Sequence, residues 1–151
     1  MTITHIANPA DLLDLTGQTL GTTDWYELRQ DQVNLFADAT GDHQWIHTDP
    51  ERAALGPFKG TIAHGYLTLA LAPRVLADVL TIDNVQAALN YGLNKVRFPS
   101  PVPVGAKLRA TVTVTSAQHK PAGVEVVYGL TYEVDGTERP ACIADVVVLY
   151  R

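Results

Sequence analysis

Residues 65 to 80 form a segment that is apolar almost all the way round, and this segment constrains the fold most. A helix that is apolar on every side has to be surrounded by protein. Pro73 lacks an N–H group, so we expect it to kink or split the helix. Polar residues interrupt the longer stretch from Ile62 to Ile82, so it reads as a core helix and not a membrane span. The apolar positions are Tyr66, Leu67, Leu69, Ala70, Leu71, Val75, Leu76, Val79 and Leu80.

The second half of the chain alternates between apolar and polar residues, as β-strands do. Asp135-Gly136 is typical of a hairpin turn. The last apolar run contains a single charged residue, Asp145, which predicts burial on much of both faces. Long strands joined by short turns favour an antiparallel sheet, and one buried helix beside it favours an α+β fold with the sheet curled around the helix. Strands are expected near Thr22–Tyr26, Leu89–Phe98, Leu108–Thr115, Val124–Val134 and Cys142–Tyr150.

The first half reads as helices and loops. The apolar spacing of Gln30 to Ala39 predicts a helix, which Gly41 is suited to end in a left-handed conformation. Asp49 and Pro50 suit the N-cap and first position of a second helix, and Gly56-Pro57 should end it. Residues 42 to 48 are therefore expected to form a short loop between helices, where functional groups are often presented.

Length and composition narrow the class of protein. A chain of 151 residues with 46% hydrophobic and 18% charged residues predicts one globular domain over residues 1–151. The only cysteine, Cys142, is expected to be a buried core thiol more readily than a catalytic one, and it allows no disulfide framework. A net charge of −5 argues against general nucleic-acid binding. The N-terminus does not resemble a signal peptide, so we expect a cytoplasmic protein.

Asp42 and His47 stand five residues apart in the expected loop. A carboxylate and an imidazole held together can bind a water molecule and move protons near neutral pH. Asp42 can equally brace a turn, and a lone histidine is more often structural than catalytic. A metal site with His43 is a further possibility, but no other ligand cluster accompanies it, so we expect no metal.

His64-Gly65 opens the apolar segment. The free amides at a helix start can bind a polarised carbonyl oxygen, which suggests substrate binding there. Alternatively, His64-Gly65 forms only a tight turn that leads into the helix. Lys95 and Arg97 lie two apart, so they share one face of a strand. They suit either a solvated sheet edge or a clamp for phosphate groups.

Three blocks of the sequence resemble the MaoC-like dehydratases, a family that includes the (R)-specific enoyl-CoA hydratases called hydratase 2. The first block is Phe36 to His47, which is similar to a family pattern of Gly-Asp, any residue, Asn-Pro, an aliphatic residue and His. The second is Phe58 to Tyr66, and the third is Val96 to Val102 with Gly105. The resemblance runs from about Thr19 to Tyr150.

The resemblance implies a single hot-dog fold, in which a curved antiparallel sheet wraps a long helix. It implies a homodimer with its active site near the interface, and addition of water to a trans-2-enoyl-CoA to give an (R)-3-hydroxyacyl-CoA. By position it makes Asp42 and His47 the catalytic pair and puts Gly65 at the oxyanion site. That chemistry needs no cofactor and no metal.

Gln44-Trp45 departs from the family pattern, which usually has Asn-Pro there. A loop without proline is less rigid, and tryptophan is much larger, so the change bears on substrate range more than on the reaction. Two other functions stay open. One is a hot-dog acyl-CoA thioesterase, and the other is a non-catalytic subunit that binds acyl-CoA or acyl-carrier protein.

Overall fold

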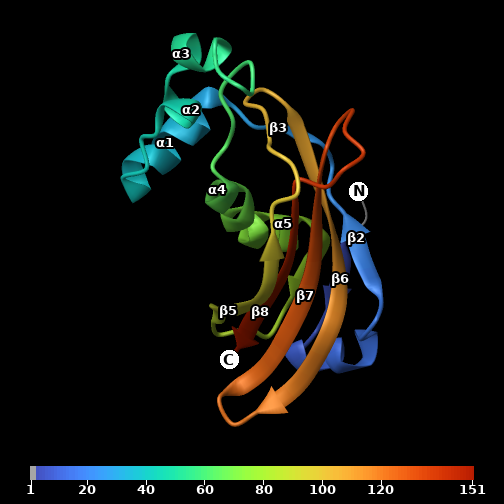
Figure 1. Cartoon of the computed structure of the whole chain (residues 1–151). Helices are drawn as coiled ribbons and strands as arrows, with labels where there is room; N and C mark the ends of the chain where they lie inside the picture. The colour runs from blue at the N-terminus through green and yellow to red at the C-terminus, as the bar shows by residue number, and fades with distance from the viewer. Residues whose placement is uncertain (1–2) are drawn as a thin grey trace.

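An antiparallel sheet built mainly from the second half of the chain forms the body of the molecule (Figure 1). The computed structural model describes residues 3–151; Met1 and Thr2, part of the segment judged not to be a signal peptide, lie outside it. The sheet has six strands and curves around the two helices α4 and α5. Its strands are β2 (Thr19–Thr22), β3 (Tyr26–Glu27), β5 (Ala88–Arg97), β6 (Lys107–Lys120), β7 (Gly123–Val134) and β8 (Cys142–Tyr150).

The strand order is β2-β6-β7-β8-β5, and β3 also pairs with β6. β5 therefore pairs with β8 and not with β6, although β6 follows it in the chain. The link over residues 98–106 leads from the edge strand β5 past β8 and β7 to β6, and it passes the start of α4 on the way. Ala63 N donates to Val102 O, and Val104 N donates to Thr61 O. This crossing is what brings the third sequence block beside the second.

The apolar segment is two helices, α4 (Gly65–Ala70) and α5 (Ala72–Val79). The expected split is confirmed, with Leu71 at the junction and Pro73 in the first turn of α5, where a missing N–H costs nothing. Val75 and Val79 are fully buried against the sheet. The expectation of burial on every side is wrong for Tyr66, which is 74% exposed, because α4 begins at an open cavity.

Three helices precede them: α1 (Gln30–Thr40), α2 (Trp45–Thr48) and α3 (Pro50–Ala54). Gly41 ends α1 at φ +79°, and the Asp49 carboxylate accepts from Arg52 N at 3.1 Å to cap α3, so both expectations are confirmed. The expected loop over 42–48 is wrong in its second half, which forms the single turn α2. Hydrogen bonds close that turn, including Asp49 N to Trp45 O at 3.1 Å.

The strand expectations are confirmed for the four long strands and wrong for the short one. Residues 23–25 separate β2 from β3, because Thr23 turns inward and its hydroxyl accepts from Ala110 N at 3.0 Å. β8 is buried over most of both faces, and Cys142 is fully buried in the core. The remaining elements are a 3-10 helix η1 (Pro9–Leu15) and a parallel pair, β1 (Thr4–Ile6) with β4 (Leu80–Ile82).

Candidate active site

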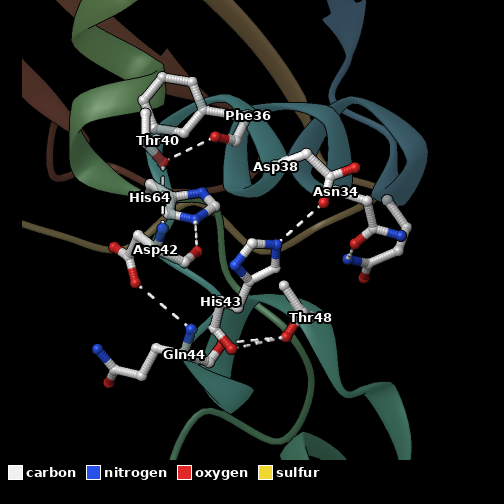
Figure 2. Close-up of polar contacts among 10 residues, drawn as sticks. Asn34, Phe36, Asp38, Thr40, Asp42, His43, Gln44, Thr48 and His64 are labelled. Carbon is white, nitrogen blue, oxygen red and sulfur yellow. Dashed lines mark hydrogen bonds and ion pairs between the residues drawn. The ribbon is translucent and has the colours of Figure 1, made fainter.

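The turn between α1 and α2 presents Asp42 at the surface of a cavity. Gly41 reverses the chain, and the Asp42 amide donates to Thr40 Oγ1 at 3.4 Å (Figure 2). Within residues 3–151, the one hydrogen bond to this carboxylate is a long one from the Gln44 amide, also 3.4 Å. Because so few donors engage it, this carboxylate keeps acceptor capacity for a ligand.

His47 lies on α2 and is 6% exposed. Its Nδ1 lies 2.7 Å from the backbone oxygen of Ile62. A carbonyl oxygen only accepts, so Nδ1 carries the proton in the neutral ring and Nε2 keeps a free lone pair. The α2 backbone is held as well, because Gln30 Nε2 donates to His47 O at 2.7 Å and Gln30 Oε1 accepts from Thr61 at 2.7 Å. The geometry thus presents His47 as a fixed proton acceptor.

His64 is the N-cap residue of α4 and is 3% exposed. Its Nε2 donates to the backbone oxygen of Asp42 at 3.0 Å, which ties the Asp42 turn to the start of α4 (Figure 2). Its ring stacks on His47 with centroids 3.9 Å apart and lies 4.9 Å from Phe36. Among the described residues nothing hydrogen-bonds its buried Nδ1. These contacts make His64 a bridge between Asp42 and His47.

Gly65 is the first residue of α4, where backbone amides have no partner within the helix. A Cβ at this position would come within 3.3 Å of the Phe98 ring. Only glycine leaves this tight space free beside the ring. Since Phe98 follows directly on β5, the crossing segment forms one wall of the site.

Two cavities meet at His47, Gly65 and Phe98. One has a volume of about 510 Å³ and also contacts the Asp42 turn. The other, about 280 Å³, is lined mostly by apolar residues and prolines. Sequence reasoning missed Phe36, Thr40 and Phe98 as wall residues, although all three belong to the recognised blocks. It also missed the role of the Ile62 carbonyl, because a backbone atom gives no signal in the sequence.

A cluster of possible metal ligands is present; it keeps Asp42 and His47 from the hypothesis made on the sequence and has His64 in place of His43. Ligand atoms of Asp42, His47 and His64 lie within 4.8 Å of one another. The planes of the two stacked imidazoles are 24° apart. His43 points elsewhere: its Nε2 meets Asp38 Oδ1 at 2.9 Å, and this hydrogen bond raises the pKa of His43.

Lys95 and Arg97 line neither cavity. Both are exposed on β5, and Arg97 Nη1 donates to the neighbouring Val96 O at 2.7 Å. The structure therefore brings Asp42, His47, His64 and Gly65 together and leaves the two cations on the strand that leads to the cavity wall.

Residues 11–135 match the family described as MaoC like domain, so the chain belongs to the MaoC-like dehydratase family. It is similar to 3-hydroxyacyl-thioester dehydratase Z of Mycobacterium tuberculosis, with 54% identity over 142 residues covering 93% of this chain and 94% of the relative. Nodulation protein N of Rhizobium leguminosarum bv. viciae is 41% identical over 148 residues, covering 96% and 92%.

Solved structures agree on the fold. The (R)-hydratase from A. caviae involved in PHA biosynthesis superimposes with a TM-score of 0.73 at 23% identity, covering 90% of this chain and 96% of that one. The expected hot-dog α+β fold is confirmed. Over residues 3–151, no helix is long and apolar enough to cross a membrane.

Proposed function

We propose that this chain is an (R)-specific enoyl-CoA hydratase, which adds water reversibly to a trans-2-enoyl-CoA to give an (R)-3-hydroxyacyl-CoA. The observation that carries the proposal is the free Nε2 of His47, fixed by the bond from Nδ1 to Ile62 O and close to the Asp42 carboxylate. Membership of a dehydratase family and the similarity to a thioester dehydratase support the same reaction.

His47 Nε2 takes a proton from water as the water oxygen bonds to C3. The electrons of the double bond move toward the thioester oxygen, where the Gly65 amide at the start of α4 stabilises the enolate-like charge. The proton that His47 took from water then passes to the Asp42 carboxylate, which delivers it to C2. One water is consumed, and neither residue changes overall.

The two cavities support a substrate with a polar and an apolar part. In our proposal the reacting carbons lie where the cavities meet, beside His47, Gly65 and Phe98. Lys95 and Arg97 would contact the phosphate groups of CoA from the adjoining strand. We also propose that residues 1–151 act as a single domain and assemble as a homodimer.

Removing either member of the catalytic pair tests this function. General acid–base groups contribute about 10²–10⁴-fold to a rate. We expect Asp42→Asn and His47→Gln each to lower kcat for crotonyl-CoA hydration by at least about 10²-fold. Circular dichroism and melting temperature should stay close to the parent values. Near-normal turnover in either folded variant would remove that residue from the mechanism.

A further inference from the structure

Trp45, the residue that departs from the family pattern, is packed between two parts of the following segment. It is the first residue of α2, and the guanidinium carbon of Arg52 lies 4.4 Å from the centre of its ring. A Cβ at Gly56 would lie only 3.0 Å from the ring atoms Cη2 and Cζ3. The indole therefore contacts both the helix α3 and the turn that ends it.

Glycine is needed at position 56 because of this packing and not because of an unusual backbone conformation there. The left-handed conformation that favours glycine occurs at Gly41 and four other glycines, but Gly56 is not among them. An alanine at Gly56 is thus allowed by the backbone conformation, but the Trp45 ring has to give way by a few tenths of an ångström; the new Cβ would also lie 3.3 Å from Ala53 O.

The short helix α2 needs such contacts, because one turn of helix is unstable alone. Its two middle residues are held, because Gln30 Nε2 donates to His47 O and the Ile62 amide donates to Ile46 O at 2.9 Å. Its first residue, Trp45, is held by the contacts of its own ring. His47 follows two residues later on the same turn, so a shift of this end changes the direction of its Nε2.

We propose that Trp45, clamped between Arg52 and Gly56, is a positioning residue that sets His47 against Asp42. The inference rests on the proposed hydratase function. Trp45 touches no reacting atom in this account. It acts by fixing the end of α2, a task that a proline can perform differently, by restricting the backbone.

The backbone at Trp45 is compatible with proline. Position N1 of a helix needs no N–H, and proline is favoured there. The preceding residue, Gln44, has φ −54° and ψ 137°, in the extended region that a residue before proline adopts. Trp45→Pro should thus replace a ring-based restraint with a backbone one, whereas Trp45→Ala removes the restraint.

The experiment compares Trp45→Ala, Trp45→Pro, Gly56→Ala and the double variant with proline at 45 and alanine at 56. A misplaced catalytic group costs up to about 10²-fold. We expect Trp45→Ala and Gly56→Ala each to lower kcat for crotonyl-CoA by about tenfold, with KM within about twofold of the parent. Trp45→Pro should restore most of kcat, and Gly56→Ala should then cost nothing further, since the ring it displaces is gone.

Leu55→Ala is the matched control, because Leu55 lies beside Gly56 but is 93% exposed; its kcat should stay at the parent value. Three results would each overturn the proposal. They are full kcat in Trp45→Ala, a folded Trp45→Pro that is as slow as Trp45→Ala, and an equal loss of kcat from Gly56→Ala in the parent and in the Trp45→Pro protein. The NMR chemical shifts of the His47 ring give a second readout, moved by Trp45→Ala and restored by Trp45→Pro. If the parent hydrates no enoyl thioester, the proposed function fails, and these chemical shifts alone decide the role of Trp45.

Discussion

At the scale of single residues, the site depends on which nitrogen of His47 is free. The Ile62 carbonyl settles this by accepting from Nδ1. Sequence spacing identified Asp42 and His47 as a pair, and they do lie together. The spacing carried no information on the Ile62 oxygen or on the stacking of His64 over His47, because both depend on segments that meet only in the folded chain.

Cys142 offers a prediction at this scale. Burial raises the pKa of its thiol to about 11, so the reactive thiolate is rare at neutral pH. We expect the native protein to resist a thiol reagent at pH 8 and to react with one equivalent after unfolding in guanidinium. Cys142→Ser should leave kcat unchanged, which separates this core thiol from the catalytic groups. Rapid labelling of the native protein would contradict the assignment.

At the scale of elements, alternation predicted β6 and β7 because one face of each is packed on the core. The core helix was predicted because its segment is apolar nearly all round, and its split because Pro73 lacks an N–H group. α2 was missed because a single turn leaves no periodic signal. The strand order was missed too, since nothing in β5 or β6 shows that two other strands lie between them.

The edge strand β5 carries the prediction for assembly. It pairs only with β8, and its side chains Leu89, Tyr91 and Leu93 are 42%, 63% and 50% exposed. An exposed apolar edge favours pairing with another strand, here proposed to be β5 of a second copy. Light scattering should give twice the chain mass at micromolar concentration.

Charges on this edge should dissociate the proposed dimer. Leu89→Lys combined with Leu93→Lys places like charges along β5 and leaves the core untouched, so we expect a folded monomer. The control is Leu55→Lys, since Leu55 is 93% exposed on another segment; that variant should stay dimeric. A parent protein that scatters as a monomer would exclude this interface.

At the scale of the whole molecule, the sheet order and the position of the site are linked. The segment after β5 leads past β8 and β7 to β6 and passes the start of α4, which puts Phe98 against Gly65. The helices α1 to α3 lie together at one end of the molecule (Figure 1), and the segment from α1 to α2 brings Asp42 and His47 to the same cavity. The three sequence blocks thus meet around one pair of cavities.

The central claim is that water attacks C3 of a bound enoyl thioester, and the fate of crotonyl-CoA tests it most directly. Hydration and thioester hydrolysis both use the amide of Gly65, so binding does not separate them. The account predicts that the conjugated enoyl-thioester absorbance disappears, that no free thiol forms, and that an (R)-specific dehydrogenase oxidises the product. Release of thiol at the rate of substrate loss would contradict the account and show that water attacks the thioester carbonyl.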